Sequence, residues 1–501
     1  MYGSILHWLV IILNFISLIS LMIPFFRNFI MSKASAVKIV PQQHIDEGTS
    51  FASTLKALED PIPSLPAKPI TISIVGAGQR GCGYAFYAKM NPQLAKVVAV
   101  AEPRESRRKK MQEIYNIPDE NVFSDWKELA KRPKISDAII IATLDHLHME
   151  PAIAFADLKY HILLEKPMSV NLDECKKITD AAIRNKIVFL VGHVLRYTPH
   201  NRLIKRIIDS GLLGNIINIQ HLEPVGNWHF AHSYVRGNWR KEQESCFSLM
   251  TKCCHDIDLM LHWNDSPCVK VSSFGNLSHF NSRNKPTGAG DAKRCLDCAY
   301  EPSCAYSAKK IYIKSFENGN TQWPVSVVTD VFDIEHLAEA LKTGPYGRCV
   351  YECDNDVADH QVVNMEFASG ATATVTMVAF TESICERKTR IFGSLGEIEC
   401  DGMNTIRYYN FLTKKKEILN ATNITGGTDL GGHGGGDIGL MEAFLYAIST
   451  KDESNKFNVS GAEETFDSHL YVFAAEHSRR IGQVVNIEDF KHTIDKTEND
   501  I

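Results

Sequence analysis

Apolar runs and helix-compatible stretches alternate through the first part of the chain. β-Branched, strongly apolar segments occur at 70–75, 96–102, 137–143 and 160–167, and polar or amphipathic segments separate them. Strands that are apolar on both faces are typical of a parallel sheet covered by helices on both sides. The pattern therefore predicts an α/β domain of the Rossmann type, a doubly wound parallel sheet, over residues 69–195.

The pattern changes after residue 195. Residues 363–376 alternate between apolar and polar and break at Ser369-Gly370, which indicates an antiparallel hairpin. Segments 214–224 and 390–402 also resemble strands, and 248–263 has the apolar spacing of a helix. We expect a second α/β domain over 196–490 with an open, mostly antiparallel sheet. It would carry a cysteine-containing insertion at 275–325, and residues 491–501 would form a frayed tail.

The N-terminal region has two interpretations. Residues 5–26 contain no Asp, Glu, Lys or Arg, and a helix of that length would cross a hydrocarbon core of roughly 30 Å. Basic residues follow the segment, which would place the remaining chain on the cytoplasmic face of a membrane. Alternatively, Met31 starts a cytoplasmic protein and residues 1–31 are dispensable. Residues 32–68 are polar and Pro-punctuated, which predicts a linker.

Composition narrows the class of protein. The 501 residues are 44% hydrophobic and 23% charged, which is ordinary for a folded protein. Lys and Arg number 54 against 59 Asp and Glu, so the net charge is −5 and no basic field favours nucleic acid. The 13 cysteines, an odd number, favour free thiols in a reducing compartment. A protein that binds small molecules is the best fit.

A glycine-rich turn follows the first predicted strand. Gly76, Gly78 and Gly81 match G-x-G-x-x-G, in which glycines form the turn, admit a pyrophosphate and let helix pack on strand. Glu102 ends the next strand, where a carboxylate binds the ribose hydroxyls of NAD. Arginines at 104, 107 and 108 leave NADP as the alternative.

Four motifs in order, GAGQRG, AEP, ATLDHLH and LLEKPMS, resemble the signatures of the Gfo/Idh/MocA oxidoreductases. The resemblance implies an NAD(P)-dependent dehydrogenase or reductase that moves hydride between nicotinamide and a sugar, polyol or related cyclic alcohol. It also implies a homo-oligomer, and it places Lys166 beside the nicotinamide and the substrate hydroxyl. The cofactor residues we expect are Gly76, Gly78, Gln79, Arg80, Gly81, Glu102, Thr143, His148, Glu165 and Lys166.

The resemblance also implies a catalytic His on the helix 248–263, and His255 matches it. Relatives carry an Asp four residues before this His, but this chain has Thr251, and Lys252 is a candidate substitute. The turn HGGGD offers His433 and Asp437 as substrate ligands. Arg196, Tyr197 and Trp239 either line a sugar site or pack the domains together.

Cys295, Cys298 and Cys304 have C-x2-C-x5-C spacing. Three thiolates at this density predict a structural zinc if Cys349 or Cys353 supplies the fourth ligand. Reduced core cysteines or a single disulfide are the alternatives.

Two other functions fit the same fold. An NAD-dependent enzyme that cleaves glycosides would oxidise its substrate transiently and reduce it again. A regulator would bind the dinucleotide without catalysis. Fold alone does not separate these hypotheses.

Overall fold

The computed structural model describes residues 55, 68–425, 432–450 and 459–497. The predicted membrane span at 5–26, the possible start at Met31 and nearly all of the predicted linker lie outside this range. Among the helices that are described, none combines the length and apolar character needed to cross a bilayer.

The first domain is a six-stranded parallel sheet in the order β3-β2-β1-β4-β5-β6. Its strands are β1 (Ile70–Val75), β2 (Ala95–Ala101), β3 (Val122–Phe123), β4 (Ala138–Ile141), β5 (His161–Leu164) and β6 (Phe189–Val191). Its helices are α3 (Gln79–Met90), α4 (Glu105–Tyr115), α5 (Trp126–Ala130), α6 (Met149–Asp157) and α7 (Leu172–Asn185). Strand order reverses at β1, and this switch point is where open α/β sheets bind ligands. The predicted Rossmann fold is confirmed.

The second domain contains a nine-stranded sheet in the order β14-β13-β12-β11-β7-β10-β9-β8-β15. Strands β7 and β10 are parallel and all other neighbours are antiparallel. The strands are β7 (Ile216–Pro224), β8 (Cys268–Asn276), β9 (His360–Phe367), β10 (Thr372–Val378), β11 (Lys388–Gly393), β12 (Gly396–Cys400), β13 (Thr405–Asn410), β14 (Lys416–Asn420) and β15 (Val485–Asn486). The predicted open, mostly antiparallel sheet is confirmed.

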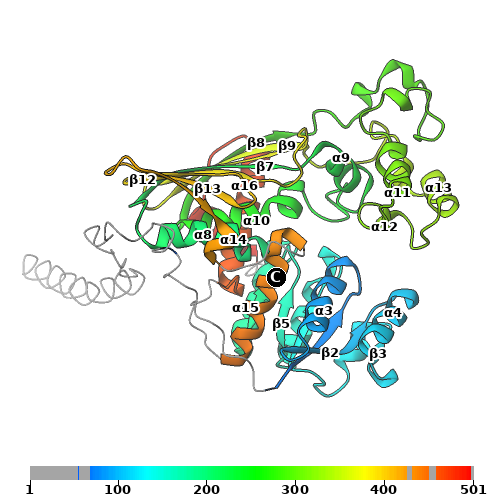
Figure 1. Cartoon of the computed structure of the whole chain (residues 1–501), viewed down its shortest axis with the longest axis horizontal. Coiled ribbons are helices and arrows are strands. Elements are labelled where there is room, and N and C mark those ends of the chain that lie inside the picture. Colours follow the sequence, from blue (N-terminus) through cyan, green and yellow to red (C-terminus); the bar gives the residue numbers. More distant parts are fainter. Residues whose placement is uncertain (1–54, 56–67, 426–431, 451–458, 498–501) are drawn as a thin grey trace, which may run out of the picture.

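Helices connect this sheet to the first domain. They are α8 (Pro199–Asp209), α10 (Ser248–Trp263), α14 (Ala421–Thr425) and α16 (Ala462–Ile481). Figure 1 shows the sheet edge on, with α8, α10 and α16 on the side that faces the first domain. Helix α10 matches the helix predicted from the sequence, and it is buried along nearly its whole length. It therefore presents its side chains to the joint between the domains.

The hairpin of β9 and β10 forms as the alternation predicts. Val363 lies opposite Val375 and Met365 opposite Ala373, and all four side chains are buried. Gly370 makes the turn with a positive φ of 86°, a conformation that glycine adopts without strain.

The insertion is longer than predicted, because the whole segment 277–359 lies between β8 and β9. It contains α11 (Lys314–Glu317), α12 (Val325–Val328) and α13 (Ile334–Thr343). It lies beside the short helix α9 (Asn227–Phe230) of the second domain (Figure 1). It has its own small core, formed by Cys295, Ala308, Ile311, Tyr312, Val325, Leu337, Leu341 and Tyr346. A second core of this kind makes the insertion a subdomain rather than a loop.

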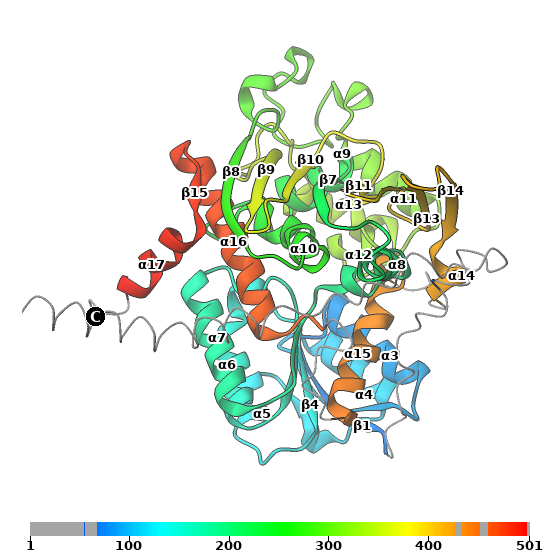
Figure 2. The same ribbon diagram turned by 90° about the vertical axis from the view of Figure 1, so that its left-hand side faces the viewer.

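Two C-terminal segments differ from expectation. Helix α15 (Gly436–Thr450) belongs to the predicted second domain, but Leu440 and Phe444 share a buried cluster with Ile70 of β1. Figure 2 shows it beside α3. Helix α17 (Ile487–Thr497) extends into the predicted tail. Asn486 explains its formation, because its side-chain oxygen accepts hydrogen bonds from the N–H groups of Glu488 and Asp489 and so caps the first turn.

Candidate functional site

The glycine turn between β1 and α3 leaves no room for a side chain at Gly76 or at Gly81. A Cβ at Gly76 would lie 2.5 Å from the carbonyl oxygen of Ala142, and Gly76 has a φ of 92°. A Cβ at Gly81 would lie 1.9 Å from the carbonyl oxygen of Gly76. Gly78 precedes α3, and no side chain caps that helix end. The turn thus presents a bare helix N-terminus, which suits a pyrophosphate.

Glu102 lies at the tip of β2 beside this turn. Its carboxylate accepts hydrogen bonds from the N–H of Ala77, at 2.7 Å, and of Arg104, at 2.9 Å. These bonds fix the two oxygens at the edge of the sheet while leaving acceptor capacity for ribose hydroxyls. Across the turn, the hydroxyl oxygen of Thr143 is buried and has no hydrogen-bond partner in the structure. The residues present therefore fit a dinucleotide.

Arg80, on the first turn of α3, connects two regions far apart in the sequence. Its guanidinium binds Glu165 at 2.6 Å and Asp437 at 2.9 Å, and Tyr84 also donates to Glu165 at 2.6 Å. Burial would raise the pKa of Glu165, but Arg80 and Tyr84 lower it below its ordinary value, so this carboxylate is ionised. His433 contacts Asp437 at 3.1 Å. Asp437 and His433, predicted as substrate ligands, thus lie against the cofactor turn.

Lys166 bridges the two domains. Its ammonium donates to the backbone carbonyl of Thr251 on α10 at 2.9 Å. The backbone N–H of Lys166 donates to the carboxylate of Glu165. His148 is fully buried and its Nδ1 contacts the carbonyl of Pro167 at 2.8 Å, so it supports the loop that carries Lys166. The amine therefore lies at the carboxyl end of β5, next to the helix that carries His255.

His255 lies one turn after Thr251 on α10. It is buried, and its Nδ1 has no hydrogen-bond partner. Burial lowers the pKa of His255 well below 6.5, and the positive charge of Lys166 lowers it further. The imidazole is therefore neutral near pH 7, which is the form that accepts a proton. The His193 ring packs edge-on against it, with the centroids 5.5 Å apart.

Thr251 and Lys252 do not replace the missing Asp in a simple way. The Thr251 hydroxyl hydrogen-bonds within its own helix, to the carbonyls of Phe247 and Ser248. The ammonium of Lys252 lies 3.3 Å from the carboxylate of Glu223 and donates to the Cys385 sulfur at 2.9 Å. Lys252 is therefore part of a charged cluster at the end of β7 and the start of β11.

Arg387 and Asp256 extend this cluster. Arg387 binds Glu223 at 3.0 Å and Asp256 at 2.8 Å. Glu223, Cys385 and Arg387 belong to none of the motifs found in the sequence. None of the three stands out in the sequence, because the strand that ends with Glu223 also carries Asn218, Gln220 and His221.

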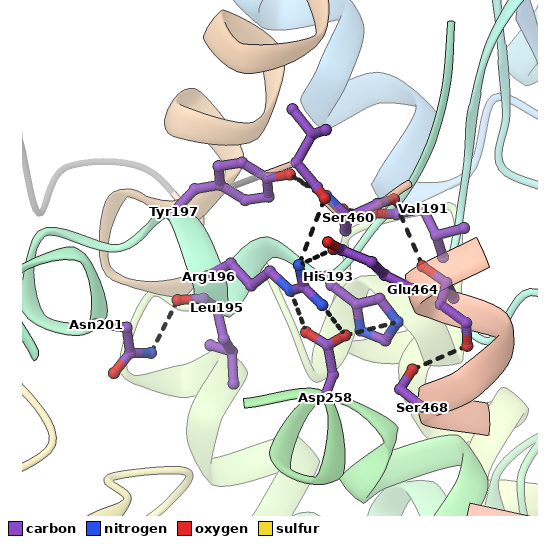
Figure 3. A network of polar contacts seen from close by, with 12 residues as sticks. Val191, His193, Leu195, Arg196, Tyr197, Asn201, Asp258, Ser460, Glu464 and Ser468 are labelled. Atoms are coloured by element: carbon purple, nitrogen blue, oxygen red, sulfur yellow. Dashed lines mark hydrogen bonds and ion pairs between the residues drawn. The ribbon is translucent and has the colours of Figure 1, made fainter. Parts of the chain in front are cut away.

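Arg196 and Tyr197 lie in the domain joint (Figure 3). Arg196 is buried and forms two 2.6 Å bonds with Asp258 and one of 2.7 Å with Glu464. The Tyr197 hydroxyl contacts Ser460. Trp239 donates from its indole nitrogen to Asp145 at 2.9 Å, which also joins the two domains. The polar atoms of Arg196 and Tyr197 are buried and already hydrogen-bonded within the protein. For these two residues, this favours a role in packing the domains together over a role in binding a sugar.

The structure does not support the predicted zinc site. Cys295, Cys298, Cys304 and Cys349 line one small cavity with Arg236. Over the described ranges, however, no group of three or more His, Cys, Asp or Glu side chains is arranged to hold a metal ion. Burial raises the pKa of the Cys304 and Cys349 thiols, which disfavours the thiolate form that zinc requires. All thirteen cysteines lie in the described residues and are free, as the composition predicts.

The fold and the site together define a dinucleotide-binding protein with a lysine and a histidine at its domain joint. Residues 70–193 match a family model described as an oxidoreductase family with an NAD-binding Rossmann fold. Residues 205–423 match the C-terminal alpha/beta domain of the same family. The chain therefore belongs to the Gfo/Idh/MocA oxidoreductases, as the four motifs indicate.

Similar proteins agree with this assignment. The oxidoreductase YteT of Bacillus subtilis is 24% identical over 379 residues, which cover 71% of this chain and 82% of YteT. Levoglucosan dehydrogenase of Pseudarthrobacter phenanthrenivorans is 33% identical over 163 residues, 30% of this chain and 40% of the enzyme. This chain spans about half the length of several other relatives that it matches.

Solved structures show the same fold. The complex of a levoglucosan dehydrogenase with NADH and levoglucosan superposes with a TM-score of 0.61. Its sequence is 19% identical, and the superposition covers 84% of this chain and 100% of that chain. Agreement over both domains supports the arrangement of the Rossmann domain and the nine-stranded sheet described above.

Buried histidines predict an acid-sensitive fold. Burial lowers the pKa of His232 and of His469 to about 3, whereas both rings protonate near pH 6.5 in the unfolded chain. Stability is therefore complete above about pH 6.5 and is lost as the pH falls below it. We expect the unfolding free energy to drop by about 2 kcal/mol between pH 6.5 and 5.5, at roughly 1 kcal/mol for each of the two rings. Guanidinium unfolding at pH 7.5, 6.5 and 5.5 tests this, and equal midpoints at all three values would contradict it.

Proposed function

We propose that this protein is an NAD-dependent dehydrogenase or reductase acting on a CH–OH group of a sugar, polyol or related cyclic alcohol. The observation that carries the proposal is the meeting of Lys166 and helix α10 directly beside the glycine turn, with 2.9 Å between Lys166 Nζ and the carbonyl of Thr251. A bound nicotinamide dinucleotide supplies the hydride acceptor or donor. The glycine turn, Glu102 and Thr143 would hold it.

In the proposed oxidation, Lys166 donates a hydrogen bond to the substrate oxygen and holds the reacting carbon against the nicotinamide. His255, neutral near pH 7, accepts the hydroxyl proton as the C–H bond gives up its hydride and the carbonyl forms. In reduction, the protonated ring returns this proton to the oxygen. The buried joint between α10 and the first domain excludes water from the reacting groups.

Glu102 favours NAD over NADP, because its carboxylate repels a 2′-phosphate at the ribose position. Arg80, Glu165, His433 and Asp437 position the loops around the cofactor. Support for the substrate class comes from the levoglucosan dehydrogenase, a relative whose name identifies an anhydrosugar alcohol as its substrate. We place Lys252, which contacts Glu223 and Cys385, at the far wall of the substrate site.

The test combines binding with turnover. The protein is titrated with NAD, and then the formation of NADH is followed by absorbance with a panel of polyols, inositols, anhydrosugars and aldoses. We expect saturable NAD binding and NADH formation with at least one member. Glycoside cleavage without net NADH would favour the redox-neutral alternative. Binding without any reaction of either kind would favour the regulator, and a failure to bind dinucleotide would overturn the proposal.

A further inference from the structure

The insertion reaches the cofactor turn of the first domain. Ser326 of α12 accepts a hydrogen bond from the Gln79 side chain, at the start of α3, at 3.0 Å. Asp330, a few residues further on, binds the Arg107 guanidinium of α4 at 3.5 Å. Contacts with both α3 and α4 place this part of the insertion across the end of the sheet where the dinucleotide site lies.

The stretch from Trp323 to Asp330 is held firmly at its start. Val325 is fully buried in the core of the insertion. The Trp323 ring lies 4.9 Å from Trp228 and 4.9 Å, edge-on, from His229 of the second domain. Aromatic contacts of this kind anchor the start of the stretch against the second domain.

Arg107 lies over the glycine turn. One of its terminal nitrogens is 4.0 Å from the position that a Cβ on Gly78 would occupy. The neighbouring Arg108 instead donates to the backbone carbonyls of Glu102 and Pro103. Of the two arginines on α4, Arg107 is therefore the one placed to meet a phosphate at this turn.

We propose that Asp330 is a cofactor-specificity residue that the insertion supplies to the dinucleotide site. By binding Arg107, it occupies the cation that a 2′-phosphate would otherwise recruit. It also adds a second carboxylate to the one that Glu102 already presents, so the phosphate meets more negative charge. The ribose of NAD needs neither arginine and is not opposed. This inference rests on the proposed function, because it concerns the cofactor of that same site.

The test measures dinucleotide binding rather than turnover. Equilibrium titrations with NAD and with NADP are made on the whole protein and on Asp330→Asn. The pair is half-exposed, and such pairs contribute up to about 1 kcal/mol, or roughly fivefold in affinity. We expect Asp330→Asn to bind NADP about 2- to 5-fold more tightly, with NAD affinity changed less than about twofold.

Two controls make the result specific. Glu335→Gln removes the same charge from an exposed position on α13 of the same insertion, and we expect it to leave both affinities unchanged. In Arg107→Ala/Asp330→Asn the gain for NADP should disappear. The inference is overturned if the gain for NADP survives in the double variant, or if Asp330→Asn leaves the NADP affinity unchanged. In either case, NAD binding by the parent protein leaves the proposed function standing. A parent protein that binds neither dinucleotide overturns both.

Discussion

Replacement of Lys166 by alanine should reduce turnover by about 10²- to 10⁴-fold while NAD binding persists. The Lys166 ammonium joins the end of β5 to α10 by its hydrogen bond to the Thr251 carbonyl. It also lies close enough to His255 to lower the pKa of that ring. Its loss removes the proposed hydrogen bond to the substrate oxygen and a positive charge that, in addition to burial, lowers the pKa of His255. The glycine turn and Glu102 are untouched. Steady-state rates, together with NAD titration of the same preparation, measure the two effects separately.

A matched variant controls for loss of a surface charge. Lys177 is exposed on α7 of the same domain, and Lys177→Ala should retain full activity. If Lys166→Ala kept more than about a tenth of the parent rate, the proposed hydrogen bond from this amine to the substrate oxygen would not contribute substantially to the reaction. Loss of NAD binding in parallel with activity would indicate a structural role for Lys166 instead.

Local patterns predicted the fold well where each element depends on its own neighbours. The four buried strands of the first domain, the hairpin at Gly370 and helix α10 follow from the period of apolar residues. The tail from residue 491 was predicted less well. There, the apolar period is weak, but a capping side chain, Asn486, is sufficient to start a helix.

Long-range contacts set the limit of prediction for the site. Short motifs indicated the glycine turn and Lys166, and the resemblance to the family indicated His255. The sequence did not show that Asp437 binds Arg80, since these residues are 357 positions apart. Nor did it show that Ser326 reaches Gln79, 247 positions away. No periodicity carries such information, because the contacts depend on how whole domains pack.

The cysteines illustrate a second limit. C-x2-C-x5-C spacing brings Cys295, Cys298 and Cys304 around one cavity whether or not a metal is bound. The burial that gathers them also raises the pKa of Cys304 and keeps this thiol protonated. The spacing therefore predicts that these cysteines lie near one another, but it does not predict whether their thiols are ionised.

A buried ion pair holds the two domains together at the site. Asp258 of α10 accepts two 2.6 Å bonds from Arg196, which follows β6 (Figure 3). Both side chains are almost completely buried. Arg196 also binds the carboxylate of Glu464, whose side chain is 41% exposed. The charge of Arg196 is thus balanced mainly by Asp258, and α10 carries His255 one turn earlier.

Asp258→Asn should therefore destabilise the fold by about 3–5 kcal/mol, because it leaves the Arg196 charge buried without its main partner. Asparagine keeps the shape of the side chain, so the loss reports charge rather than volume. Guanidinium unfolding at pH 7 measures the change. The control is Asp180→Asn, which breaks an exposed pair with Lys176 on α7 and should cost no more than about 0.5 kcal/mol. A loss below about 1 kcal/mol for Asp258→Asn would mean that hydrogen bonding and packing, not the ion pair, hold α10 against the first domain.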